Sequence, residues 1–277
     1  MTSQLLYMKR ILFFVLIAIV FTACNNNNSN SNNSEPVNNG IKPPVTLGIQ
    51  ILDMYPHDTT SFTEGLECRD TVLYESSGLK GKSKLSKIAL RSGKALRQLD
   101  LAKEYFGEGI TILNGKIYQL TWQEHKCFVY DFKTFDKIGE FNYEGEGWGM
   151  TNDGKHLIMD NGNNNLYFRD PETFKIVNTI GVIDNNGPLD SINELEFVDG
   201  FIYANIWMTN YIVKIDPVSG QVVAKADLTD LINRYVPSTL PAETDGSYPN
   251  GICYDHINNQ FYITGKLWPK IFVVRFF

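Results

Sequence analysis

The chain has 277 residues, of which 43% are hydrophobic, 20% charged and 13% aromatic, a composition that excludes disorder throughout. Its 14 Tyr, 17 Phe and 22 Gly favour strands and turns. The formal net charge of −6 excludes the basic surface that nucleic-acid binding needs, so we expect no nucleic-acid partner.

Residues 1–24 have the pattern of an export signal. Lys9 and Arg10 precede an apolar run over 11–21, and Cys24 follows shortly after. A helix of that length spans about 16 Å, whereas a bilayer core is about 30 Å thick. We therefore predict a signal peptide, whose end resembles the lipid-attachment site of bacterial lipoproteins, with Cys24 as the lipidated residue. An uncleaved anchor is the alternative, and both interpretations place the folded part on a membrane tether at the periplasmic face or the cell surface.

Residues 25–44 are predicted to be a disordered tether. Residues 25–40 contain nine Asn, and Glu35 is the only charged residue among them. Such a segment cannot bury enough apolar surface to fold. The folded domain is therefore expected over 45–277.

The folded part contains an internal repeat. Five segments share a short strand, a polar turn, an aromatic strand and a third strand, after a start that is Gly-apolar in four of them. They begin at Glu64, Glu108, Trp148, Asn193 and Asn250, in steps of 44, 40, 45 and 57 residues. Four short antiparallel strands repeated about every 45 residues are typical of a β-propeller blade. Five blades account for the length that remains after the tether.

The strand pattern is clearest in the second unit. Strands are predicted over 110–113 and 116–122, joined by Asn114-Gly115, a pair typical of a type I′ hairpin turn. Third strands are predicted over 128–131 and, in the fourth unit, over 211–215.

The two ends of the folded part are expected to close the ring. The chain ends just after a predicted third strand, 271–275, so the strand predicted over 46–52 is expected to supply the missing outer strand. The longest step between units contains a short predicted helix over 227–235 with an Asp cap. We therefore predict an all-β fold, a five-bladed β-propeller with four-stranded antiparallel blades closed by an N-terminal strand; a β-sandwich with coincidental spacing is the alternative.

The repeat also predicts where a site lies. Inner strands of a propeller start at one face of the central channel, so the first residue of each unit is expected on one ring with the ends of the second strands. The ring would hold two carboxylates, two amides, indoles and one ammonium, from Glu64, Glu108, Trp148, Asn193, Asn250, Trp122, Trp207 and Lys266. An aromatic cavity with a few convergent polar groups is typical of a small-ligand or active site.

The remaining chemistry-bearing residues show no pattern. The four histidines, His57, His125, His156 and His256, are scattered, so we expect neither a catalytic triad nor a zinc set, and we expect His57 in a turn. Cys68, Cys127 and Cys253 are expected to be buried structural thiols.

Several motifs together resemble one enzyme family. They are Ser61-Phe-Thr-Glu-Gly-Leu66, Phe106-Gly-Glu-Gly-Ile110, Gly147-Trp-Gly149, Asn193-Glu-Leu-Glu196, Ala204-Asn-Ile-Trp207 and Thr264-Gly-Lys-Leu-Trp-Pro-Lys270. In order and spacing they resemble the glutamine cyclotransferases of plant and bacterial type, which are five-bladed propellers without a catalytic metal. The resemblance implies a glutaminyl-peptide cyclotransferase, which converts the N-terminal Gln of peptides or proteins to pyroglutamate and releases ammonia.

The resemblance also implies roles for individual residues. The essential acid of the family corresponds to Glu108, its aromatic substrate-binding residues to Phe62, Phe106, Trp122, Trp148 and Trp207, and its polar contributors to Asn193 and Lys266. One position departs from the plant pattern, because Glu64 stands where the plant enzymes have Gln. A second carboxylate near Glu108 is expected to raise one pKa or to help hold the amino group of the substrate.

These residues suggest a mechanism and leave two alternatives. Glu108 is the candidate proton shuttle, and Lys266, or an indole N–H with Asn193, is the candidate oxyanion stabiliser. We expect a monomer with no cofactor and no metal. A metal-dependent propeller lactonase or hydrolase using Glu64, Glu108, Asn193 and Asn250 is one alternative, and a non-catalytic peptide- or glycan-binding surface lipoprotein is the other.

Overall fold

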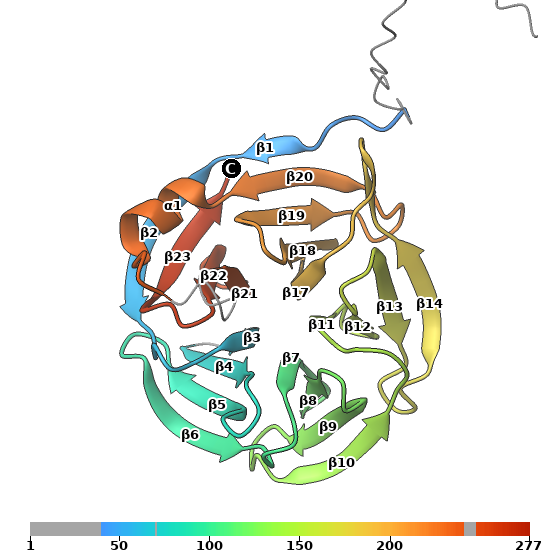
Figure 1. The fold of residues 1–277 in the computed structure, drawn as a ribbon. Helices are drawn as coiled ribbons and strands as arrows, with labels where there is room; N and C mark the ends of the chain where they lie inside the picture. Colours follow the sequence, from blue (N-terminus) through green and yellow to red (C-terminus); the bar gives the residue numbers. More distant parts are fainter. Residues whose placement is uncertain (1–39, 70, 241–247) are drawn as a thin grey trace, which may run out of the picture. The chain divides into compact units, whose positions relative to one another are not determined.

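A computed structural model describes residues 40–69, 71–240 and 248–277. The predicted signal peptide 1–24, with Cys24, lies outside the described residues, and so does the predicted tether up to residue 39. The described chain forms the predicted ring of five blades, in which the inner strands β3, β7, β11, β17 and β21 surround the centre (Figure 1).

Each blade is an antiparallel sheet whose strands follow chain order from the centre outwards, except in the last blade. Blade 1 contains β3 (Thr63–Arg69), β4 (Val72–Ser77), β5 (Lys84–Ala89) and β6 (Lys94–Asp100). Blade 2 contains β7 (Gly107–Leu113), β8 (Lys116–Thr121), β9 (Lys126–Asp131) and β10 (Lys137–Asn142). Blade 3 contains β11 (Met150–Asn152), β12 (Leu157–Met159), β13 (Asn165–Arg169) and β14 (Ile176–Gly181). Blade 4 contains β17 (Ile192–Val198), β18 (Phe201–Ile206), β19 (Tyr211–Ile215) and β20 (Val222–Asp227), and blade 5 contains β21 (Pro249–Asp255), β22 (Gln260–Gly265) and β23 (Lys270–Phe276).

The blade boundaries agree with the sequence repeat. Every inner strand begins within two residues of the predicted unit start, as β7 does beside Glu108. The Asn114-Gly115 turn joins β7 to β8, and both residues have positive φ, 52° and 75°, as a type I′ turn requires. The spacing of the repeat therefore correctly predicted a propeller rather than a sandwich.

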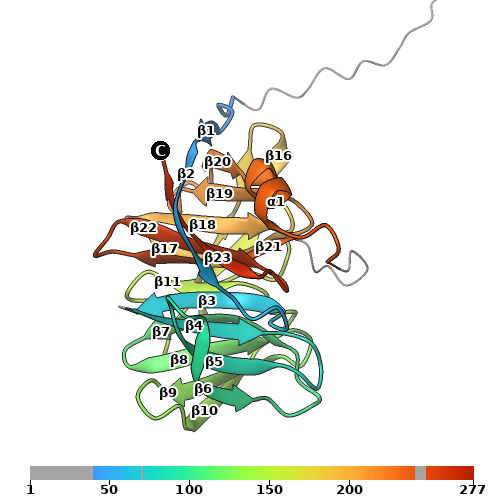
Figure 2. The same ribbon diagram turned by 90° about the vertical axis from the view of Figure 1, so that its left-hand side faces the viewer.

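The closing strand differs from the prediction in its bounds. The predicted strand 46–52 divides at Gly48: β1 (Val45–Leu47) adds a parallel fifth strand to β20, whereas β2 (Ile49–Pro56) pairs antiparallel with β23 and completes blade 5. Figure 2 shows β2 running alongside β23. A Cβ at residue 48 would overlap the ring of Phe277, so glycine allows the chain to cross from one blade to the next. The N-terminal strand thus closes the ring, but only from residue 49.

Two further elements lie on the blade connections. The hairpin of β15 (Ile183–Asp184) and β16 (Gly187–Pro188) joins blade 3 to blade 4. The predicted helix is α1 (Thr229–Tyr235), and its N-cap is Leu228 rather than an Asp. Asp227, one residue before the observed N-cap, accepts a hydrogen bond from the Thr229 N–H at 2.9 Å. In the described parts of the chain, no helix is long and apolar enough to cross a membrane.

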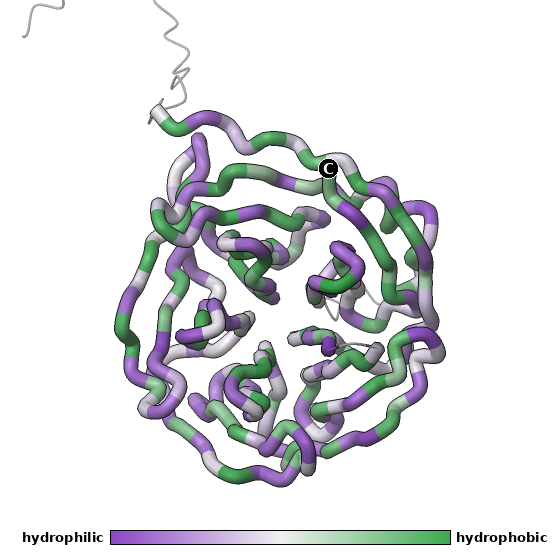
Figure 3. Tube along the Cα trace, turned by 180° about the vertical axis from the view of Figure 1, so that it is seen from behind, coloured by the Kyte–Doolittle hydropathy of each residue, from purple (hydrophilic) through white to green (hydrophobic). Residues whose placement is uncertain are grey.

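The hydrophobic core lies between the blades. Five clusters of buried side chains fill the five interfaces, so each blade packs on both of its neighbours. Hydrophobic and hydrophilic residues alternate along the outer strands in Figure 3, as expected for sheets that bury part of their surface. Cys68, Cys127 and Cys253 are buried free thiols, as predicted.

Candidate active site

The predicted ring residues lie at one face of the propeller. Phe62 and Phe106 come directly before the inner strands β3 and β7, and Trp148 lies two residues before β11. Three residues of the predicted ring, Trp122, Trp207 and Lys266, directly follow the second strands β8, β18 and β22. The other four are the second residues of the inner strands β3, β7, β17 and β21, and they are Glu64, Glu108, Asn193 and Asn250. Because inner strands begin where second strands end, all of these residues are held by the same ends of the blades.

The aromatic side chains form a row, Phe62, Phe106, Trp122, Trp148 and Trp207, which we call the aromatic row. The ring centroids of Phe62 and Phe106 lie 6.2 Å apart, and those of Phe106 and Trp122 lie 5.6 Å apart, both edge-on. Trp148 and Trp207 meet edge-on at 5.4 Å. Edge-to-face packing is a favourable aromatic geometry, which makes the row a rigid wall running from blade 1 to blade 4.

Glu146 joins the two halves of the aromatic row. Its Oε2 atom accepts hydrogen bonds from the indole N–H of Trp122 at 2.8 Å and from that of Trp148 at 2.9 Å. Partial burial acts to raise the pKa of Glu146, but a hydrogen bond from the Gln123 amide at 2.9 Å and the two indole bonds hold it below its usual value. Glu146 was not among the residues predicted from the sequence.

Two glycines make room for the aromatic row. Gly78 and Gly162 occupy, in blades 1 and 3, the place that Trp122 occupies in blade 2. A Cβ at Gly78 would overlap the ring of Phe106, and a Cβ at Gly162 would lie 2.7 Å from the ring of Trp148. The aromatic rings of neighbouring blades therefore pack against these glycines.

Glu64 is firmly held by its neighbours. Lys266 Nζ lies 3.1 Å from Glu64 Oε1, and the Asn250 side-chain amide donates to Glu64 Oε2 at 2.7 Å. The same ammonium lies 4.7 Å from the ring centroid of Phe62. All four side chains are at least 94% buried. Lys266 thus joins blade 5 to the blade 1 end of the aromatic row.

Glu108 has a different environment. Its side chain is buried, and no hydrogen bond from another described residue reaches its carboxylate. Burial raises the pKa of Glu108 well above its usual value, and the nearby charge of Glu64 raises it further, while Lys266 acts in the opposite direction. Of the two carboxylates predicted on the ring, one is fully engaged and the other remains available for proton transfer.

Three other buried oxygens of this region lack a hydrogen-bond donor within the described chain, and one of them is Oδ1 of Asn250. Asn193 is buried, and its Oδ1 atom has no donor. The same is true of Oδ2 of Asp160, a fully buried residue that the sequence analysis did not select. Burial raises the pKa of Asp160 well above its usual value.

The sequence contained weak signals for the missed residues. Glu146 lies two positions before Trp148, just outside the Gly-Trp-Gly motif. Asp160 directly follows β12 and lies two positions before Gly162, the glycine next to the Trp148 ring. These positions alone do not predict that Glu146 binds two indoles or that Asp160 has a buried oxygen without a partner, because both environments depend on contacts between segments.

Within residues 40–69, 71–240 and 248–277, no group of three or more His, Cys, Asp or Glu side chains is arranged to hold a metal ion.

Comparison with known proteins identifies the family. The family model described as glutamine cyclotransferase matches residues 15–276. The chain is 33% identical over 229 residues to the glutaminyl-peptide cyclotransferase of Arabidopsis thaliana, covering 82% of this chain and 71% of that protein. The crystal structure of Myxococcus xanthus glutaminyl cyclase is similar with a TM-score of 0.76 and 32% identity, over 84% of this chain and 98% of that chain. The chain therefore belongs to the glutamine cyclotransferase family.

Proposed function

We propose that the protein is a glutaminyl-peptide cyclotransferase in which Glu108 moves the proton. The substrate is a peptide or protein with an N-terminal glutamine. Its α-amine attacks its own γ-carboxamide carbon, a five-membered pyroglutamate ring forms, and ammonia leaves. Family membership supports the reaction, and the contrast between Glu64 and Glu108 supports the assignment of roles.

The environment of Glu108 suits a proton shuttle. Attack of the amine creates an ammonium group on the nucleophile, while the amide nitrogen must gain a proton before it leaves. A carboxylate that takes the first proton and returns it to the second nitrogen performs both steps, and a raised pKa brings its proton affinity closer to neutral pH. Glu108 has this raised pKa and no competing hydrogen bond within the described chain, whereas Glu64 is occupied by Lys266 and Asn250.

The aromatic row suits the positioning part of the reaction. Cyclisation needs the glutamine side chain bent back on the amine, and well-oriented intramolecular reactions reach effective molarities of about 10⁵ M or more. Rigid aromatic walls favour such a conformer, and they also exclude the water that would hydrolyse the amide. Phe62, Phe106, Trp122, Trp148 and Trp207 are the proposed substrate-binding residues.

The oxyanion on the amide carbon needs a donor. Lys266 is the ammonium of this ring, and its salt bridge with Glu64 fixes its position. We assign it the stabilisation of the oxyanion, and an indole N–H together with Asn193 is the alternative donor set.

The test of the central assignment is Glu108→Gln in the tether-free protein. The change keeps the side-chain volume but removes the proton acceptor, so the rate of ammonia release from Gln-Gln and Gln-Ala peptides should fall about 10²–10⁴-fold. Glu104→Gln is the control, because Glu104 is an exposed carboxylate in the loop that precedes the site. Activity within a few-fold of wild type would overturn the role of Glu108.

The same assay separates the other functions. Loss of activity in EDTA, restored by a divalent cation, would favour a metal-dependent hydrolase. Peptide binding without any ammonia release would favour a non-catalytic binding lipoprotein.

We also propose that the enzyme is exported and attached to a bacterial membrane through a lipid on Cys24, and that its propeller is monomeric. The basic and apolar pattern before Cys24 supports this location. Labelled palmitate should enter the wild-type chain and not Cys24→Ser, which should also leave the membrane fraction. Light scattering of the tether-free protein should give the mass of one chain, and a mass twice as large would contradict the monomer.

A further inference from the structure

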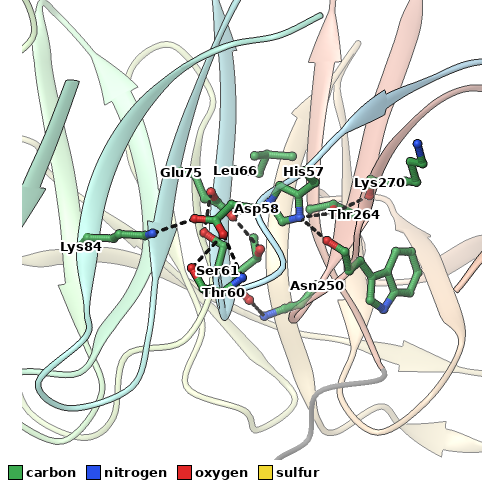
Figure 4. A network of polar contacts seen from close by, with 12 residues as sticks. His57, Asp58, Thr60, Ser61, Leu66, Glu75, Lys84, Asn250, Thr264 and Lys270 are labelled. Carbon is green, nitrogen blue, oxygen red and sulfur yellow. Dashed lines mark hydrogen bonds and ion pairs between the residues drawn. The ribbon is translucent and has the colours of Figure 1, made fainter. Parts of the chain in front are cut away.

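A buried ion pair lies behind the candidate site. His57, which follows β2, was expected in an ordinary turn, but its side chain is 1% exposed and its Nε2 atom lies 2.9 Å from Oε1 of Glu75, itself equally buried. The other ring nitrogen, Nδ1, lies 2.7 Å from the carbonyl oxygen of Trp268. Figure 4 shows His57 between Glu75 on one side and the segment with Thr264 and Lys270 on the other.

The hydrogen bonds identify the protonation state of this pair. A backbone carbonyl only accepts, so Nδ1 of His57 must carry a proton. Glu75 accepts from Ser61 Oγ at 3.0 Å and from Thr63 Oγ1 at 2.6 Å, and as a carboxylate it would accept from Nε2 of His57 as well, 2.9 Å away. With Glu75 ionised, both ring nitrogens of His57 carry a proton, and we assign His57 as an imidazolium.

The pKa shifts agree with this state. Burial alone would lower the pKa of His57, but the charge and hydrogen bond of Glu75 raise it above the usual value. Burial alone would raise the pKa of Glu75, but His57, Thr63 and Ser61 lower it. The Asp58 carboxylate also raises the pKa of His57, and it is itself paired with Lys84 at 3.1 Å.

One end of the pair holds the turn that carries Lys266. Besides the bond from Nδ1 to Trp268, the backbone N–H of His57 donates to the Pro269 carbonyl at 3.0 Å, and the Leu267 N–H donates to the Ser61 carbonyl at 2.8 Å. Leu267, next to Lys266, has a φ of 62°, a left-handed conformation that is unfavourable for leucine. A strained turn keeps its shape only when the surrounding contacts impose it.

The other end holds the residues that face Lys266. The two hydroxyls that donate to Glu75 belong to Ser61 and Thr63, which lie on either side of Phe62 and directly before Glu64. Phe62 and Glu64 both contact the Lys266 ammonium. The pair thus contacts both segments that determine where Nζ of Lys266 lies.

We propose that the His57–Glu75 ion pair positions Lys266 for catalysis by clamping the 265–269 turn of blade 5 to the 61–64 segment of blade 1. The proposal rests on the role of Lys266 in the proposed reaction. A buried ion pair often adds little net stability compared with apolar side chains of the same volume. Its function here is therefore geometric, and neither His57 nor Glu75 touches the substrate.

Two substitutions of His57 separate the two ends of the pair. The amide nitrogen of Asn can take the place of Nδ1, so His57→Asn keeps the donor to Trp268 and loses Glu75. The amide nitrogen of Gln can take the place of Nε2, so His57→Gln keeps the donor to Glu75 and loses Trp268. We expect His57→Gln to lower kcat about 10- to 100-fold with KM within about threefold, and His57→Asn to retain more of kcat, because it still holds the turn.

The control is His156→Gln. His156 also forms an ion pair, 3.0 Å from Asp153, but this pair is partly exposed in the hairpin between β11 and β12. Its loss should leave kcat and KM unchanged. Equal kcat values for wild type, His57→Gln and His57→Asn would overturn the proposal.

A double-mutant cycle tests whether the pair acts through Lys266. In the Lys266→Met background, His57→Gln should cause little further loss of kcat, because the group that it positions is gone. Full additivity of the two effects would overturn the clamp and leave the role of Lys266 intact. An active Lys266→Met enzyme with unchanged kcat would instead contradict the proposed oxyanion role, so the two failures can be told apart.

A spectroscopic measurement keeps the proposal testable if the variants do not fold. In the wild-type protein at pH 7.5, imidazole ¹⁵N shifts should show both nitrogens of His57 protonated. A neutral ring at that pH would overturn the clamp as described.

Discussion

At the scale of single residues, the site depends on two carboxylates that are close in position and different in environment. Glu64 is neutralised by Lys266 and receives the amide of Asn250, whereas the carboxylate of Glu108 has no hydrogen-bond partner within the described residues. Because the pKa of Glu108 is raised first by burial and then by the charge of Glu64, the two groups are electrostatically linked. Glu64 therefore tunes the group that we propose moves the proton.

Glu64→Gln tests this link and restores the residue that the resemblance assigns to plant enzymes. Removing the negative charge should lower the pKa of Glu108, because its ionised form is no longer repelled. Since the reaction needs ionised Glu108 in the free enzyme, the acid limb of the kcat/KM profile should move to lower pH. The α-amine of the substrate titrates equally with both enzymes, so the difference between their profiles isolates Glu108.

Glu104→Gln again serves as the control and should leave the acid limb in place, since Glu104 is exposed. An acid limb of Glu64→Gln that stays in place or moves to higher pH would contradict the link.

At the scale of elements, closure of the ring depends on one short segment near the N-terminus. Gly48 lies between the edge strand β1 and the closing strand β2. It exchanges two backbone hydrogen bonds with Phe277, at 2.8 and 3.1 Å. β2 pairs with β23 from Ile49 to Pro56, and without it β23 would be an exposed edge. The two neighbouring strands should therefore differ strongly in importance.

A pair of N-terminal truncations tests this difference. A chain that starts at Gly48 lacks only β1 and should remain active, with its Tm lowered by about 2–4 °C for each kcal/mol lost. A chain that starts at His57 lacks β2 and should show no cooperative unfolding transition. Thermal denaturation followed by circular dichroism measures both, and a cooperative transition in the shorter chain would contradict the closing role of β2.

At the scale of the whole molecule, one side chain links three blades around the centre. The second residue of the repeat is glycine in four units, Gly65, Gly109, Gly149 and Gly251, but it is Glu194 in blade 4. The Glu194 carboxylate is fully buried and accepts from the N–H of Leu66 in blade 1 at 3.0 Å and from that of Ile252 in blade 5 at 2.7 Å. The glycines allow the inner strands to approach closely, since a Cβ at Gly65 would lie 2.6 Å from the Ile110 nitrogen of the next blade.

Glu194→Gln should destabilise the ring while leaving the candidate site chemically unchanged. One amide oxygen can still accept an N–H, but the amide nitrogen would face the second N–H and leave it without an acceptor. An unsatisfied buried donor costs about 1–3 kcal/mol of unfolding free energy, which urea denaturation would measure. Glu140→Gln, at an exposed ion pair of β10, should have a much smaller effect. Equal stability of Glu194→Gln and wild type would contradict the role of Glu194 in joining the blades.

The sequence by itself determined the fold and the face that holds the site. Asn114-Gly115 and the repeated Gly-apolar starts are local signals, since turn chemistry and strand alternation act within a few residues. Five copies of the same signal predict five blades, and the shared register predicts that Glu108, Trp122 and Lys266 lie at the same ends of the blades. The prediction that the strand 46–52 completes the last blade was correct, but its bounds were wrong, because the sequence does not show that Gly48 packs against Phe277.

Only the tertiary structure decided which of these side chains bond to one another. Glu146 joins two indoles, His57 faces Glu75 and the Trp268 carbonyl, and Glu194 reaches Leu66 across 128 residues of chain. These contacts join different blades or different loops, and nothing in the local pattern of either partner specifies the other. The repeat therefore predicts where the functional residues lie, and packing between the blades decides which carboxylate is occupied and which is available.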